Sequence, residues 1–152
     1  MSEITNFNIR VYGLIINTNG EVLTSIEKYK KYTLHKFVGG GLEKGEGLKD
    51  GLQREFIEEL NSEIEVKELF YVNDFFQLSF LKKEDQIISF YYFVSPKNWG
   101  NFETCCAKTH LNQRLIWTPL KSFKTELLSL PIDQIMIEKL KLWHKKNSDQ
   151  TV

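Results

Sequence analysis

The stretch from residue 40 to residue 62 constrains this chain most, because a short helix expected there carries three glutamates on one side. Glu55, Glu58 and Glu59 fall within about one turn, so their side chains project into one arc of about 100 degrees. Like charges four residues apart cost about 0.2–0.5 kcal/mol per pair, and the helix dipole disfavours acids near the C-terminal end. Such a face is either an ordinary solvated surface or a site for a cation.

An apolar stripe on the same helix favours the cation. Leu48, Leu52, Phe56 and Leu60 follow one another at four-residue intervals, and Ile57 is expected to widen the stripe. This periodicity predicts that the helix packs on a core. The acidic arc begins where the stripe ends, so its carboxylates are expected to be partly sheltered from solvent.

Glycines crowd the loop before this helix, on both sides of Glu46: Gly39, Gly40, Gly41, Gly45 and Gly47. Glycine permits conformations and close approaches that other residues resist, so the loop carbonyls can come near a metal. Hard divalent cations such as Mg²⁺ bind through a few carboxylates, waters and substrate phosphates. Carboxylates beside a glycine loop therefore predict a divalent metal site.

The segment resembles the Nudix box, whose pattern is Gly, five residues, Glu, seven residues, Arg-Glu, apolar, any, Glu-Glu, any, Gly, apolar. The matching residues are Gly40, Glu46, Arg54, Glu55, Phe56, Glu58 and Glu59. The chain departs from the pattern at Asn61, where Gly is expected, at Ser62, where an apolar residue is expected, and at Val38, where proline is common. Because Asn is the next best residue after Gly for a left-handed helix cap, we expect the turn to close.

The resemblance implies a metal set and a cofactor. Glu55, Glu58 and Glu59 would bind Mg²⁺ or Mn²⁺ together with a loop carbonyl, that of Gly40.

The resemblance also implies a brace, a fold and a reaction. Glu46 and Arg54 would pair and tie the loop to the helix, for which an arginine–carboxylate fork is well suited. The fold would be an α/β/α sandwich with a mixed β-sheet between helices. The enzyme would be a Nudix pyrophosphohydrolase, cleaving a nucleoside diphosphate linked to another group by water attack at phosphorus. The catalytic candidates are Glu55, Glu58, Arg54 and Glu46.

The sequence does not identify the general base that accepts the proton from water, since relatives use either a box glutamate or an acid on a later loop. Between Trp99 and Trp117 the only acid is Glu103. Glu103 is either the general base or a plain loop glutamate. A general base must lie within hydrogen-bonding distance of the proton it accepts, so the sequence alone does not decide between the two.

Composition is that of an ordinary globular protein, and we expect one Nudix hydrolase domain over residues 1–152 with a short disordered tail from about residue 146. The chain is 41% hydrophobic and 26% charged, with a formal net charge of zero. This balance argues against a broad nucleic-acid surface or a polybasic membrane patch.

No signal-peptide or transmembrane run occurs, which predicts a cytoplasmic protein. Cys105 and Cys106 are adjacent and are expected to be reduced thiols. The sequence does not decide whether the protein forms a homodimer.

Hydrophobic periodicity predicts the remaining elements. Strand segments are expected at residues 8–17, 21–29, 64–74, 74–81 and 87–95, with an Asn19-Gly20 hairpin turn between the first two. Residues 33–40 lead into the box, and residues 114–123 are expected to form a last strand and a turn. A helix over 131–146 would present Ile132, Ile135, Met136, Leu140 and Trp143 on one face.

The substrate is not fixed by the sequence beyond a small-molecule nucleoside diphosphate derivative. Aromatic residues at 75, 76 and 90–93 are either core or a platform for a base, and Arg10, His35 and Lys36 are either solvated or phosphate contacts. Two other functions compete with a nucleotide hydrolase: a nucleotide-sensing module without turnover and an RNA 5′-end pyrophosphohydrolase. Since all three acidic metal positions are present, the enzyme is favoured.

Overall fold

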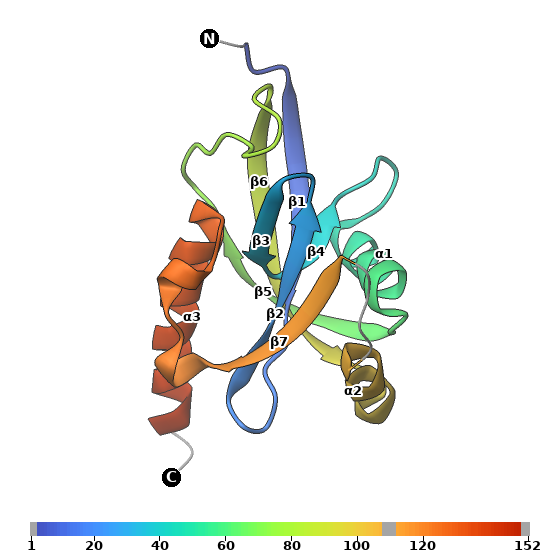
Figure 1. The fold of residues 1–152 in the computed structure, drawn as a ribbon, viewed down its shortest axis with the longest axis vertical. Helices are drawn as coiled ribbons and strands as arrows, with labels where there is room; N and C mark the ends of the chain where they lie inside the picture. The colour runs from blue at the N-terminus through green and yellow to red at the C-terminus, as the bar shows by residue number, and fades with distance from the viewer. Residues whose placement is uncertain (1–2, 108–111, 150–152) are drawn as a thin grey trace. The chain divides into compact units, whose positions relative to one another are not determined.

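The computed structural model describes residues 3–107 and 112–149 (Figure 1). The chain divides into two compact units: residues 1–14 with 38–108, and residues 15–37 with 109–152. Helix α3 (Pro131–Asp149) extends past residue 146, so the disordered tail is not found at 146–149, and the rest of it lies outside the described residues.

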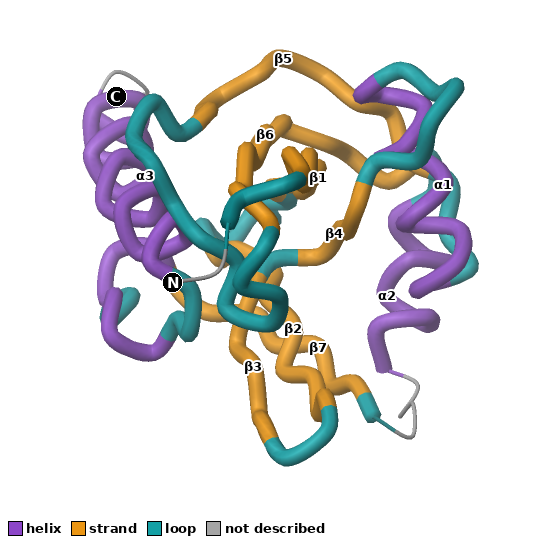
Figure 2. Tube along the Cα trace, turned by 90° about the horizontal axis from the view of Figure 1, so that it is seen from above, coloured by secondary structure: helices purple, strands orange, loops and turns teal. Residues whose placement is uncertain are grey.

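The first unit is a four-stranded mixed sheet with two helices. Its strand order is β4 (Val38–Gly41), β1 (Asn6–Leu14), β6 (Asp85–Pro96) and β5 (Ile64–Val72). β1 runs parallel to β6, whereas the β1–β4 and β5–β6 pairs are antiparallel. Helices α1 (Leu48–Leu60) and α2 (Trp99–Ala107) complete the unit, and Figure 2 shows α1 beside the end of β4. The sheet places the last residues of β4 directly before the loop that leads into α1.

The second unit is a three-stranded antiparallel sheet with one long helix. Its strand order is β3 (Tyr32–Lys36), β2 (Glu21–Tyr29) and β7 (Gln113–Pro119). Two 3-10 turns, at Leu120–Ser122 and Thr125–Leu127, connect β7 to α3. The α/β class and the mixed sheet are thus as predicted, with the strands shared between two sheets.

Helix α1 forms where its apolar stripe and its cap predict. Leu52, Phe56 and Leu60 are buried, with at most 1% of each exposed. Asn61 adopts the left-handed conformation, with φ 48°, and its N–H donates to the Ile57 carbonyl. This is the cap expected of an Asn standing in for Gly. The expectation that Ile57 widens the buried stripe is wrong, because its side chain is 50% exposed.

Two of the other sequence predictions need correction. The Asn19-Gly20 turn is present and is followed by an isolated bridge between Ile16 and Val22, but β1 and β2 do not form a hairpin because they belong to different sheets. Residues 74–81 form no strand and contribute a single bridge, Leu78 to Gln86. Residues 33–40, which lead into the box, belong to β3 and β4.

On helix α3 the buried face is shifted from the predicted one. Ile132, Met136 and Leu140 are buried as expected, and Ile137 joins them with no exposed surface. Ile135 is 41% exposed and Trp143 is 36% exposed, so both lie at the margin of that face.

Candidate active site

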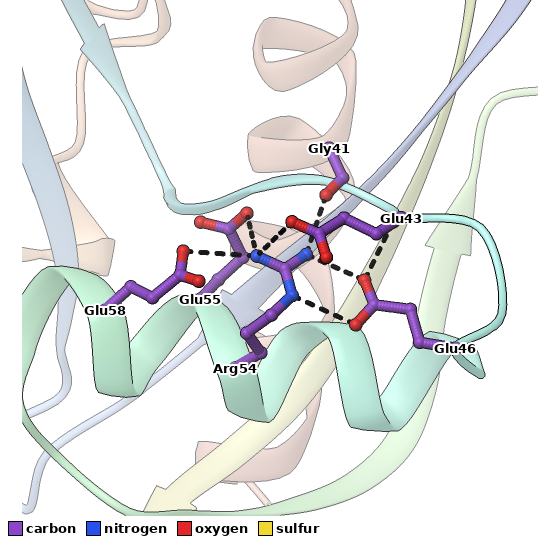
Figure 3. Close-up of polar contacts among 6 residues, drawn as sticks. All are labelled: Gly41, Glu43, Glu46, Arg54, Glu55 and Glu58. Carbon is purple, nitrogen blue, oxygen red and sulfur yellow. Dashed lines mark hydrogen bonds and ion pairs between the residues drawn. The ribbon is translucent and has the colours of Figure 1, made fainter.

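Arg54 lies at the centre of the site, with its guanidinium surrounded by carboxylates (Figure 3). Its Nε donates to Glu46 Oε2 at 3.0 Å and its Nη2 donates to Glu46 Oε1 at 2.7 Å. This fork holds the pKa of Glu46 at about 2, with a smaller contribution from the backbone N–H of Glu43. The same hydrogen bond raises the pKa of Arg54 above its already high value. The pair between Glu46 and Arg54 is therefore a permanently charged brace at neutral pH.

The other side of the same guanidinium is directed to the acidic face of α1. Arg54 Nη1 lies 3.1 Å from Glu55 Oε1 and 3.2 Å from Glu58 Oε2. Its Nη2 also donates to the Gly41 carbonyl at 3.0 Å. One positive charge therefore offsets the repulsion between the helix acids and fixes the end of β4 against α1.

Glu55 is held in a space that only a glycine leaves open. A Cβ at Gly40 would lie 2.6 Å from Glu55 Oε1 and 2.8 Å from Oε2. Gly40 is paired with Val11 in the sheet, so its backbone cannot move away easily. Glu55 itself is only 9% exposed. The glycine at position 40 is thus needed for the position of this carboxylate, whether or not its carbonyl binds a metal.

Across residues 3–107 and 112–149, no group of three or more His, Cys, Asp or Glu side chains is arranged to hold a metal ion. The Glu55 and Glu58 carboxylates converge on Arg54 instead, and Glu59 is half-buried on the same helix. Their donor chemistry nonetheless fits a hard divalent cation, since they supply only oxygen ligands beside a bare glycine backbone. Glu58 is 57% exposed, so its carboxylate has room to turn.

The three basic residues considered for phosphate binding have different surroundings. Lys36 is buried and pairs with Glu27 at 3.4 Å. His35 Nε2 lies 2.7 Å from the Thr24 hydroxyl, and burial lowers its pKa.

Arg10 is placed next to the loop of the site. It is paired with Gly41 across the β1–β4 ladder, and its Nη1 would lie 3.7 Å from a Cβ at that glycine. Arg10 is therefore the one of the three that shares a neighbour with Arg54.

Glu103 and the aromatic residues considered for substrate binding differ in their exposure to solvent. Glu103 is exposed on helix α2 rather than on a loop, and its role as a base stays a prediction. Tyr91 and Tyr92 are buried in the sheet, at 0% and 7% exposed, which makes them core residues. Phe76 is 57% exposed.

Two site residues were not anticipated from the sequence. Gly41 contributes its carbonyl to Arg54, and Glu43 approaches Arg54 Nη1 at 3.6 Å. Glu43 precedes Glu46 by three residues and its backbone N–H donates to Glu46 Oε1 at 2.8 Å. The three-residue spacing of Glu43 and Glu46 could have predicted this contact, since a turn of this length brings the two residues together.

The family model for the NUDIX domain matches residues 6–140, which is most of the chain. The chain belongs to the Nudix family. As a family member it is a Nudix pyrophosphohydrolase, a hydrolase acting on phosphorus-containing acid anhydrides. None of the curated proteins matches the sequence.

Solved structures with sequence identities below 20% share the fold of this chain. The ORF135 protein of E. coli is 19% identical, with a TM-score of 0.66 and 88% of each chain covered. The MutT protein of Methanosarcina mazei Go1 is 19% identical, with a TM-score of 0.64 over 97% of this chain and 99% of that one. A UDP-X diphosphatase is 15% identical, with a TM-score of 0.64 over 94% of this chain and 66% of that one.

Within residues 3–107 and 112–149, no helix combines the length and the hydropathy that crossing a membrane would require.

Proposed function

We propose that this Nudix protein is a Mg²⁺- or Mn²⁺-dependent hydrolase that cleaves the diphosphate linkage of a nucleoside diphosphate joined to another group. A nucleoside triphosphate or a sugar nucleotide is the expected substrate. The observation that carries the proposal is the convergence of Glu55 and Glu58 on Arg54, next to Gly40.

The residues have separate roles in this proposal. Glu55, Glu58 and Glu59 would hold the metal together with the Gly40 carbonyl. Nudix proteins generally use divalent metals, and the bound ion would neutralise charge on the diphosphate and lower the pKa of the attacking water. Phosphoryl transfer depends on positioning and charge compensation more than on covalent catalysis.

Arg54 and Glu46 would act as positioning residues. The fork between them fixes the guanidinium, which in turn orients Glu55 and Glu58. The proton of the attacking water would pass to a glutamate of the box or to Glu103.

The direct test is hydrolysis of a substrate panel by the wild-type protein, with Mg²⁺, with Mn²⁺ and with a chelator. The panel holds nucleoside triphosphates, ADP-ribose, UDP-sugars and 5′-triphosphorylated or capped RNA. UDP-sugars are included because a protein of this fold is a UDP-X diphosphatase. Phosphate, pyrophosphate and nucleoside monophosphate are measured separately, which identifies the bond that is cleaved.

Glutamine variants test the site itself. Glu58→Gln and Glu59→Gln are expected to lower kcat/KM about 10²-fold or more, because each removes a carboxylate that would hold the charge-compensating metal ion. The matched control is Glu63→Gln, since Glu63 is 74% exposed and pairs only loosely with Lys97, at 3.9 Å. Binding without turnover of any substrate would favour the sensing module, and cleavage of RNA ends alone would favour RNA processing.

A further inference from the structure

We infer that Arg10 binds a phosphate group of the substrate, a role that rests on the proposed function and adds a residue from outside the Nudix box to the site. Arg54 is one positive charge in contact with Glu43, Glu46, Glu55 and Glu58. A diphosphate adds further negative charge, so the site needs cationic groups besides this arginine.

The position of Arg10 fits that need. Gly41, labelled in Figure 3, gives its carbonyl to Arg54 and has Arg10 as its partner on β1. The guanidinium of Arg10 is within ordinary contact distance of the space beside Gly41, at 3.7 Å from a Cβ built there. Gly41 thus has Arg54 at its carbonyl and Arg10 beside it, immediately before the acidic loop. Because neighbouring strand residues alternate, Arg10 lies on the sheet face opposite the one from which Gly40 meets Glu55.

Arg10 is also held in a fixed orientation. Its Nε donates to the Tyr12 hydroxyl at 2.6 Å, and its guanidinium carbon lies 5.7 Å from the centre of the Tyr12 ring. Tyr12 is 2% exposed and stacks on Tyr91 with ring centres 5.3 Å apart. A side chain ordered before binding loses less conformational entropy when it contacts a ligand. The planar guanidinium can contact two phosphate oxygens at once, which a lysine cannot do in the same geometry.

The face of the sheet around Arg10 is polar and open to solvent at one end. Side chains of residues two apart on β1 share a face, so Asn6, Asn8 and Arg10 lie on one side. Asn6 is exposed, and Asn8 and Arg10 are half-buried. Asn8 donates to Asp85 at 3.2 Å on the neighbouring β6. A ligand phosphate could therefore reach Arg10 without displacing an apolar core.

The alternative is that Arg10 only stabilises the sheet through Tyr12. In that case its removal would lower the thermal stability and leave nucleotide affinity unchanged. Binding and stability therefore have to be measured on the same variants.

The test is binding of α,β-methylene nucleoside triphosphates in Mg²⁺, measured by calorimetry on the full chain. Arg10→Gln is expected to weaken the affinity of the tightest analogue about tenfold or more, and Arg10→Lys by less. The control is Lys97→Gln, which removes an exposed positive charge beside Glu63 and should keep the wild-type affinity within about twofold. Wild-type affinity in Arg10→Gln, or no binding of any analogue by the wild type, would overturn the inference.

A second measurement needs no variant and so does not depend on folding. Phenylglyoxal modifies arginines, and peptide mass spectrometry reports the rate at Arg10 in the wild-type protein. A saturating analogue should slow that rate, whereas an unchanged rate would contradict direct contact. If the analogues bind through Arg10 but natural nucleotides are not hydrolysed, the hydrolase proposal fails and the assignment of Arg10 stands.

Discussion

Replacing Gly40 by alanine should separate the shape of the site from the backbone carbonyl that we propose as a metal ligand. The alanine keeps the carbonyl at position 40, and Gly40 does not have a positive φ, so the backbone can accept the change. The new Cβ would lie 2.6 Å from Glu55 Oε1, whereas ordinary contact begins at 3.4 Å. The Glu55 carboxylate must therefore move by about 0.8 Å, away from the position in which it meets Arg54.

A displacement of about 1 Å at a reacting centre costs about 10²-fold in rate, which corresponds to about 2.7 kcal/mol of transition-state stabilisation. We expect kcat/KM of Gly40→Ala to fall by about that factor. The loss of folding stability should stay near the lower end of about 1–3 kcal/mol, because the obstructing atoms are the end of a flexible side chain. The assay is product release at saturating Mg²⁺, with urea unfolding measured in parallel.

Gly100→Ala is the matched control. Its nearest neighbour would be Asn98 Oδ1 at 3.5 Å, an ordinary contact, and it lies on α2. It should keep wild-type activity. A Gly40→Ala enzyme with wild-type kcat/KM, or an equal loss in both variants, would refute the argument that space beside Glu55 determines the rate.

Three further measurements test other parts of the structure. Arg54 holds the pKa of Glu46 at about 2 instead of its usual 4.5, so the stability this pair contributes is complete above about pH 4.5 and is lost as the pH falls through about 2. The stability difference between wild type and Glu46→Gln in urea titrations should shrink over that window, and a difference independent of pH would contradict the brace. Gly13→Ala should lower the unfolding free energy by about 1–3 kcal/mol, because its Cβ would lie 2.6 Å from the Phe56 ring, and an unchanged urea midpoint would contradict that packing. Burial raises the pKa of Cys106 from 9.0 to about 12, so at pH 8 iodoacetamide should label it about 10³-fold more slowly in the folded than in the urea-unfolded protein, as peptide mass spectrometry can measure. Equal labelling rates would show that the thiol is not sheltered.

Helix α1 could be predicted from the sequence because its signals are local and agree. The apolar stripe, the glycines before it and Asn61 after it all fall within one segment, and the structure has the helix and its left-handed cap there. The fork between Arg54 and Glu46 was likewise implied by the resemblance to the Nudix box and is present. The roles of these residues in metal binding and catalysis stay predictions.

Partners distant in sequence account for most of what was missed. The Asn19-Gly20 turn forms, but the sheet that each neighbouring strand joins is decided by β6 and β7, far along the chain. Helix α2 was missed although a signal was present: Asn98 Oδ1 accepts the N–H of Asn101, which is the usual bond of a helix N-cap. In the site, the contacts of Arg54 with Glu55 and Glu58 depend on where a long side chain points, which a motif does not specify.

The parallel pairing of β1 with β6 sets an order for events during synthesis. Asn6 lies opposite Asp85, so β1 leaves the ribosome well before β6 and cannot pair with it until the strands between them in sequence have followed. Pairings of this sequence separation are slow to form, because a long loop must close before any contact rewards it. Until then the apolar side of β1 has no partner strand there and is open to aggregation or to a chaperone. Chains that end before β6 are therefore expected to be recovered mainly as insoluble material or degradation products.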